Sequence, residues 1–206
     1  MQMEGKATLI NAAGTSSSLT VGKVLGSGDS VATPPGSTVD LWLGLNGDWL
    51  RIAPESILKF EVLDIPNISE RRVTTSLRLI KGSVTGNVNI KLTADSKYEV
   101  KTPDGVADIR GTVYAFEKNG TLIVTKGVVT FTYVLNGESK TVRVEPGYQF
   151  KPGDEKPTPA PQHLLDKVAQ AAVQVADDIG TIRVGNLTVT VTPASPNPLA
   201  VSVSGE

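Results

Sequence analysis

The chain has 206 residues, of which 39% are apolar and 5% aromatic, and its mean hydropathy is near zero. Lysine and arginine number 20 and aspartate and glutamate 21, so no surplus of positive charge attracts a polyanion, and nucleic acid is not an expected partner. The absence of cysteine excludes a disulfide framework and thiolate metal sites. No apolar run approaches the ~20 residues of a membrane span.

Alternating and β-branched segments separated by glycine turns dominate the first 150 residues. Such segments occur at 98–101, 121–124, 129–133 and 141–144. The dipeptides between them favour two-residue hairpin loops, and they are Asn46-Gly47, Asp104-Gly105, Asn119-Gly120 and Asn136-Gly137. The pattern predicts an all-β fold, either an antiparallel two-layer β-sandwich or a short solenoid-like double sheet.

A faint internal repeat relates residues 79–84 to residues 124–129. Each copy carries a Lys-Gly pair before a strand, at Gly82 and Gly127. Glycine inside a strand pattern usually marks a bulge or bend, so we expect the chain to bend at both positions.

The segment Lys101–Thr112, KTPDGVADIRGT, couples a tight turn to a strand that carries Arg110-Gly111-Thr112. This pattern resembles the FecR-domain family, in which a "TP.G.A..RGT" segment is the hallmark. The surrounding segments 21–25, 28–33, 41–43, 81–84 and 146–150 are similar to the family pattern as well. The resemblance covers about residues 5–153, and it implies an extracytoplasmic β domain that binds or assembles rather than catalyses.

The composition changes after Phe150. Residues 151–161 contain four prolines and read as an extended, semi-rigid linker. Beyond it, apolar residues recur every three or four positions, which predicts one amphipathic helix ended by Gly180, and they are Leu164, Leu165, Val168, Ala171, Ala172, Val175 and Ile179. Strands are expected at 181–184, 187–191 and 199–203, either completing the sheet of the same molecule or adding to a neighbour. We therefore divide the chain into a FecR-like β domain (1–153), a linker (154–161) and a C-terminal helix with strands (162–206).

No catalytic constellation is visible. The single histidine, His163, stands at the start of the expected helix with no nucleophile beside it. There is no Gly-x-Ser-x-Gly elbow, and Gly26–Ser30 lacks the lysine and the following helix of a phosphate loop. Carboxylates lack the spacing of a calcium loop. We expect a protein that is not an enzyme and that needs no metal or cofactor.

Arg110 is the best candidate for a specific role, with Gly111, Thr112 and Tyr114 beside it. Strict alternation places Arg110, Thr112 and Tyr114 on one face of a strand. The arginine is then either buried and held by carbonyls or a carboxylate, or stacked on Tyr114 at the surface. We favour the structural role, in which Arg110→Ala costs a few kcal/mol.

Trp42 and Trp49 form a second candidate pair. A two-residue loop at Asn46-Gly47 pairs Leu43 with Leu50, which places both indoles on the face opposite four aliphatic residues. They form either an exposed patch for sugars or proteins, or a face covered by another sheet or by the C-terminal helix. We expect both to be largely covered.

Two functions from different classes follow. The first is a structural or interaction protein of the cell envelope or exterior, binding a protein partner or itself and self-assembling through its C-terminal strands. The alternative is a periplasmic signalling module that relays receptor state to an anti-sigma and sigma factor system, as the resemblance implies. Residues 1–5 lack a basic region followed by an apolar one, so we expect that an export signal is absent from this sequence.

Overall fold

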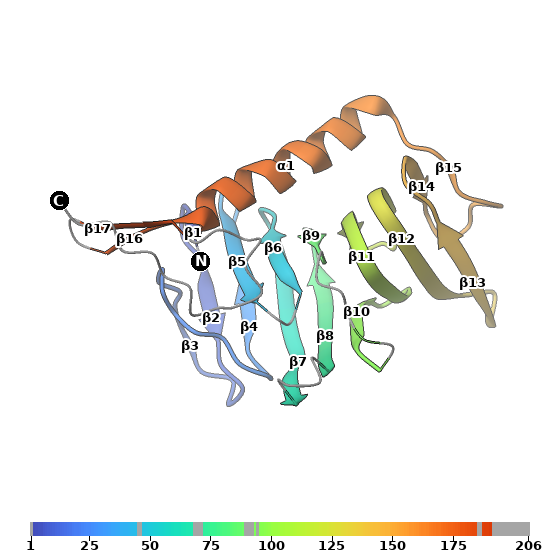
Figure 1. Ribbon diagram of the computed structural model, residues 1–206. Coiled ribbons are helices and arrows are strands. Elements are labelled where there is room, and N and C mark those ends of the chain that lie inside the picture. The colour runs from blue at the N-terminus through green and yellow to red at the C-terminus, as the bar shows by residue number, and fades with distance from the viewer. Residues whose placement is uncertain are drawn as a thin grey trace.

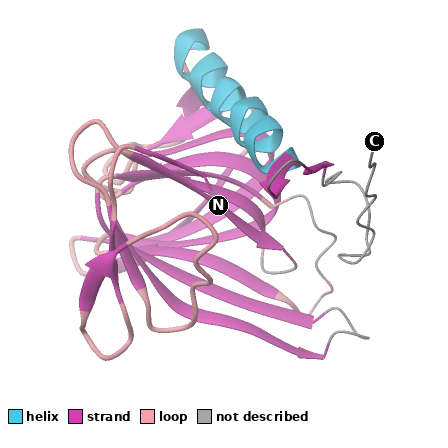
Figure 2. Ribbon diagram, turned by 90° about the vertical axis from the view of Figure 1, so that its left-hand side faces the viewer, coloured by secondary structure: helices cyan, strands magenta, loops and turns pink. Residues whose placement is uncertain are grey.

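The computed structural model describes residues 2–44, 47–67, 72–88, 93, 95–184 and 187–190. Its strands form two layers that face each other across one core (Figures 1 and 2). The layer beneath the helix, here the helix-side layer, consists of β1 (Gln2–Glu4), β5 (Thr38–Gly44), β6 (Asp48–Ile52), β9 (Ser83–Asn87), the second part of β11 (Gly105–Glu117), the first part of β12 (Leu122–Leu135), β14 (Tyr148–Phe150) and β15 (Thr158–Pro159). The opposite layer, here the open layer, consists of β3 (Ser16–Ser18), β2 (Thr8–Ile10), β4 (Ser30–Ala32), β7 (Ile57–Asn67), β8 (Arg72–Lys81), β10 (Lys97–Thr102), the remaining parts of β11 and β12, and β13 (Glu138–Val144).

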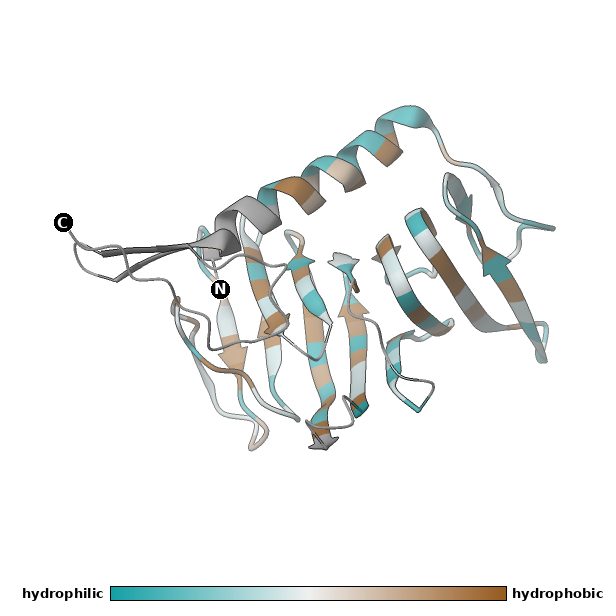
Figure 3. Cartoon of the chain, in the orientation of Figure 1, coloured by the Kyte–Doolittle hydropathy of each residue, from teal (hydrophilic) through white to brown (hydrophobic). Residues whose placement is uncertain are grey.

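The core lies between the layers because apolar and polar residues alternate along most strands (Figure 3). Leu50 and Ile52 of β6 and Leu77 and Leu79 of β8 are completely buried and belong to one hydrophobic cluster. An aromatic group centred on Phe131 fills the end of the core nearest β13 and β14.

The expectation of an all-β fold with one C-terminal helix is confirmed. Two details of the pattern are corrected. β10 pairs with β8 in parallel, so the sheet is mixed rather than purely antiparallel. Among the described turns, Asn136-Gly137 is a two-residue hairpin loop, with positive φ at both residues. Thr102 pairs with Gly105, so the loop there is Pro103-Asp104. The Glu117 amide donates to the Thr121 carbonyl, so Asn119-Gly120 is part of a longer loop. Asn46 lies outside the described residues.

The expected bends at the two Lys-Gly pairs are present. Gly82 has φ 78° and joins β8 in the open layer to β9 in the helix-side layer. Gly127 has φ 74° inside β12, where that strand passes from one layer to the other. Both positions are in the left-handed region that glycine adopts without a steric cost.

The single described helix, α1 (Gln162–Gly180), crosses the outer face of the helix-side layer (Figure 1). Val168 is buried against Ile123 and Ala160, and Leu164 and Leu165 are half-buried around them. The predicted apolar stripe therefore faces the sheet over residues 164–172, while the side chains of Val175 and Ile179 lie outside the described part.

The segment before the helix lies along the sheet and is hydrogen-bonded to it. β15 pairs with β14, and the amide of Ala160 donates to the carbonyl of Gly147 at 2.9 Å. After the helix, β16 (Thr181–Val184) and β17 (Leu187–Thr190) pair with each other in a separate antiparallel sheet. The strand expected at 199–203 lies outside the described residues.

Candidate functional site

The Arg-Gly-Thr motif forms a crease at which the two longest strands pass between the layers. Gly111 has φ 61°, and the register between β11 and β12 shifts on either side of Val113. Gly127 of β12 lies directly against this bend, because a Cβ placed on it would be 2.2 Å from the carbonyl oxygen of Gly111. At Gly127 the crease therefore brings the two backbones closer than a residue with a Cβ allows.

Thr112 holds the crease through its hydroxyl. The residue is fully buried, and its Oγ1 lies 2.9 Å from the Arg110 carbonyl oxygen and 3.1 Å from that of Val128. Its backbone exchanges two hydrogen bonds with Val88, which follows β9. A hydroxyl in this position compensates carbonyls that the bend removes from the strand ladder.

The bend changes which side chains face the core, and this overturns the predicted role of Arg110. Ile109 is buried before the bend, whereas Thr112 and Tyr114 are buried after it, so the alternation shifts by one residue. Arg110 is exposed, with 53% of its side chain accessible, and its Nε lies 3.8 Å from Asp108 Oδ1. The expectations of a buried guanidinium and of a guanidinium stacked on Tyr114 are both wrong.

Tyr114 and Tyr98 form a buried hydroxyl pair across the two layers, with their oxygens 3.2 Å apart. Burial raises the pKa of both phenols, so both stay protonated. Gly86 and Gly47 leave room for these rings, because a Cβ at Gly86 would lie 2.6 Å from the Tyr114 oxygen and one at Gly47 2.2 Å from a Tyr98 ring carbon. Tyr114 is therefore a core residue and not a surface group.

The two tryptophans lie opposite each other, but they differ in exposure. Leu41 pairs with Leu50 and Trp42 with Trp49, beside a bulge near Gly44, so each observed partner lies two residues from the predicted one. Both indoles are on the face that α1 crosses, as one alternative held. Trp49 is 4% exposed, but Trp42 is 45% exposed, so the expected coverage applies to Trp49 alone.

Arg51 connects this face to the helix. Its Nε and Nη2 each donate to Asp40 at 2.7 Å, and its Nη1 donates to the side-chain oxygen of Gln174 at 2.9 Å. The two hydrogen bonds to Asp40 fix the orientation of the guanidinium, so that its Nη1 points toward Gln174 of α1.

The outer face of the open layer carries a network of charges across three strands, here the charged ladder. Its members are Glu61, Ser76, Arg78, Lys97, Glu99 and Lys101. Lys101 Nζ bridges Glu61 at 3.0 Å and Glu99 at 2.9 Å, and Lys97 contacts Glu99 at 2.7 Å. Arg78 pairs with Glu61. The sequence analysis missed this cluster because its members come from different strands. The one local signal was a charged residue, Glu99, between the apolar residues Tyr98 and Val100 of a predicted strand.

Hydrogen bonding lowers the pKa values of both ladder carboxyls. Burial alone favours the protonated acid at Glu99, but hydrogen bonds from Lys97, Lys101 and Ser76 outweigh it and lower its pKa. The pKa of Glu61 is lowered in the same way, against its own burial, by Arg78 and Lys101. The hydrogen bond to Glu99 and that to Glu61 raise the pKa of Lys101.

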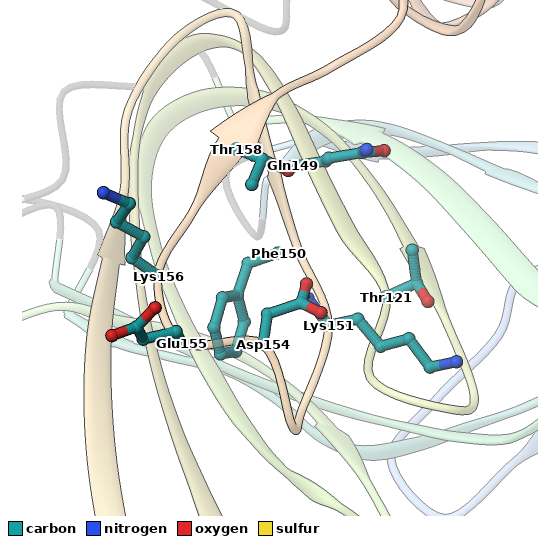
Figure 4. A pocket seen from close by; sticks show the side chains of 8 residues that line it. All are labelled: Thr121, Gln149, Phe150, Lys151, Asp154, Glu155, Lys156 and Thr158. Carbon is teal, nitrogen blue, oxygen red and sulfur yellow. The ribbon is translucent and has the colours of Figure 1, made fainter.

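A shallow hollow, lined mostly by residues with polar or charged side chains, lies beside β14 (Figure 4). Its volume is about 480 Å³, and its lining includes Lys151, Asp154, Glu155 and Lys156 from the turn after β14. The Asp154 carboxylate accepts a hydrogen bond from the Lys151 amide at 2.9 Å, so it closes its own turn. His163 is exposed at the start of α1 and is not part of the hollow.

Within the described ranges, no group of three or more His, Cys, Asp or Glu side chains lies close enough to hold a metal ion. No helix in the same part of the chain is long and apolar enough to cross a membrane.

Comparisons with known proteins agree with this architecture. Residues 29–130 match the family model described as FecR protein, so the predicted resemblance is confirmed there and this segment is a FecR domain. Two crystal structures, each described as a proposed anti-sigma factor from Parabacteroides distasonis ATCC 8503, have related folds at 10% identity. One gives a TM-score of 0.52 over 73% of this chain and 72% of its own; the other gives 0.48 over 64% and 58%. No curated protein matches the chain.

Removing the Thr112 hydroxyl is expected to weaken the crease. Thr112→Val keeps the shape but leaves two part-buried carbonyls without their donor, so the free energy of unfolding should fall by about 1–3 kcal/mol. Thr112→Ser keeps the hydroxyl and serves as the control. Arg110→Ala should stay within ~0.5 kcal/mol of the unchanged protein, as exposed substitutions do. Urea titrations of all three variants measure these differences, and a large loss for Arg110→Ala would restore its structural role.

The two indoles are expected to have different emission spectra. With Trp42→Phe, the remaining Trp49 should emit at short wavelength and be quenched weakly by iodide, because it is buried. With Trp49→Phe, the remaining Trp42 should emit at longer wavelength and be quenched strongly. Equal quenching of the two variants would contradict the arrangement of this face.

Glu99 is expected to make stability depend on pH. Its pKa is lower in the folded chain than its ordinary value of 4.5, so its stabilising contribution is complete above that pH and is lost as the pH falls through the folded value. Glu99→Gln should therefore cost about 1–3 kcal/mol at pH 7, and the difference from the unchanged protein should shrink below pH 4.5. Unfolding free energies measured from pH 7 to pH 3 test this, and a difference that does not vary with pH would count against it.

Proposed function

We propose that this chain is a non-enzymatic, extracytoplasmic protein-binding domain that takes part in signalling through an anti-sigma factor. The match of residues 29–130 to the FecR family is the observation that carries this proposal. The fold likeness to a proposed anti-sigma factor, at a TM-score of 0.52, supports it.

The outer face of the open layer is the surface that we assign to the protein partner. α1 packs on strands of the other layer, so it leaves this face free. The face is polar, with the charged ladder at its centre, Arg110 exposed on β11 and Arg143 exposed on β13. Charges in such an arrangement give orientation and specificity to a protein contact more than raw affinity.

Deletion of the gene in its source cell tests the signalling role. Transcription from promoters of a sigma factor encoded beside it should change on deletion and return with the intact gene. An unchanged transcript profile would overturn the proposal.

A binding measurement tests the surface. We expect the purified chain to bind the signalling domain of a receptor encoded beside it, and a double reversal, Arg110→Glu with Arg143→Glu, to weaken binding about tenfold or more. Lys167→Glu, an exposed reversal on α1, is the matched control and should bind as the unchanged chain does. Equal affinity of both variants would place the contact elsewhere.

A second candidate function is a structural protein that self-assembles through its C-terminal strands. The observation that favours it is the hairpin of β16 and β17, which among the described residues pairs only with itself. Truncation after Gly180 tests this function. If these strands drive assembly, the truncated chain should have a lower oligomeric mass by light scattering than the full chain. An unchanged mass would exclude assembly by these strands.

A further inference from the structure

We infer that α1 is a detachable cover, and that its release uncovers an apolar strip on the FecR sheet as a second, regulated docking surface. The strip consists of Val113, Ala115 and Ile123. Release of α1 does not depend on the proposed signalling role, but its use as regulation rests on that function.

The first observation is that the helix belongs to a separate, smaller core. The main cluster lies between the layers, and most of its members are completely inaccessible. The cluster beneath α1 contains three buried residues, Ile123, Ala160 and Val168, and each keeps 5–9% of its surface. Breaking this small cluster does not open the main core, and such units open before the whole molecule unfolds.

The charges at the two ends of the helix contribute little to its stability. Its first turn has no acidic residue and its last turn no basic one, so side-chain charges do not favour its dipole. Val173 points to solvent with 62% of its surface exposed. Most of the stability of an amphipathic helix comes from packing its apolar face, so detachment also allows α1 to unfold.

The described polar contacts between α1 and the sheet can break and form again. Arg51 is held by Asp40 whether or not α1 is docked, so the hydrogen bond to Gln174 can break without leaving a buried unpaired charge. At the other end, the two-residue strand β15 and the Ala160 amide tie the helix to the sheet. The prolines of residues 151–161 limit how far the released helix can move.

The surface beneath α1 suits another amphipathic helix. It is apolar in the middle and ends at the Arg51 guanidinium, and it already accepts apolar residues spaced as in Leu164, Leu165 and Val168. A partner helix of the same pattern with a hydrogen-bond acceptor about two turns later would compete with α1 for it.

Two single-cysteine variants of the full chain test the release, since the natural chain contains no cysteine. Ile123 and Val124 are neighbours on β12, both buried, but Ile123 faces α1 and Val124 faces the main core. Under native conditions, a thiol-specific reagent should label Ile123→Cys at least ~10-fold faster than Val124→Cys. Low urea should accelerate labelling at position 124 more than at position 123, because only the former needs global unfolding.

A third substitution keeps the test decisive if Ile123→Cys loosens the sheet by itself. Val168→Asp, added to each cysteine variant, weakens α1 docking without entering the main core, and it should accelerate labelling at position 123, while position 124, which opens only on global unfolding, should remain at least ~10-fold slower. Equal labelling rates at both positions, with the urea dependence of global unfolding, would overturn the inference. Because no partner is needed, this result is independent of the transcription experiment.

Discussion

Gly127→Ala is expected to destabilise the protein by about 2–5 kcal/mol. The left-handed backbone, with φ 74°, costs a residue with a Cβ about 1–2 kcal/mol. The added methyl would also lie 2.2 Å from the Gly111 carbonyl oxygen, which belongs to backbone and cannot rotate away, and overpacking adds about 1–3 kcal/mol. The midpoint of urea unfolding measures the sum.

Gly111→Ala is the matched control for this result. Gly111 has a similar φ of 61°, but nothing lies within 4 Å of an added Cβ. It should therefore cost only the conformational term of about 1–2 kcal/mol. If the two glycine variants lose the same stability, the close approach of β11 and β12 is not what the crease requires.

Phe131→Ala is expected to cost about 3–5 kcal/mol, the usual effect of emptying a buried aromatic site. Phe131 is completely buried, and its ring contacts Phe116 edge-on at a centroid distance of 5.4 Å and Phe150 at 6.2 Å. These rings come from β12, β11 and β14, so one deletion loosens three strands.

The neighbouring Thr132 provides the control, because it is exposed on the opposite face of β12. Thr132→Ala removes a surface contact with Thr141 and should change stability by no more than ~0.5 kcal/mol. Thermal unfolding of both variants distinguishes a core effect from a general weakness of β12. Similar losses for the two variants would contradict the central place of Phe131.

The sequence correctly predicted the elements that are determined by residues close together in the chain. Asn136-Gly137 forms its hairpin because both residues tolerate positive φ. The apolar stripe from Leu164 to Ala172 faces the sheet, and α1 ends at Gly180, as the spacing predicted. Gly82 and Gly127 bend the chain, as glycines inside a strand pattern usually do.

The errors occur where the chain adds or shifts one residue. Alternation places Arg110 and Tyr114 on one face, but the bend at Gly111 separates them, so one is exposed and the other buried. At Trp42, beside a bulge near Gly44, the partner differs by two residues from the predicted one, so both indoles stay on the predicted face. A single-residue slip reverses side-chain direction and leaves no mark on composition. The charged ladder was equally hidden, because Glu61 and Lys101 are forty positions apart.

The segment that matches the family is shorter than the part of the chain that forms the core. The segment that matches the FecR family ends at Thr130, inside β12, one residue before Phe131. Leu9 and Leu19 before the matched segment, and Tyr133, Val144 and Phe150 after it, all belong to the same closed core. A protein cut at the family boundaries would lack β13 and β14 and leave β12 half paired, so an evolutionary module of this kind reaches a native state only when its flanking sequence is supplied with it.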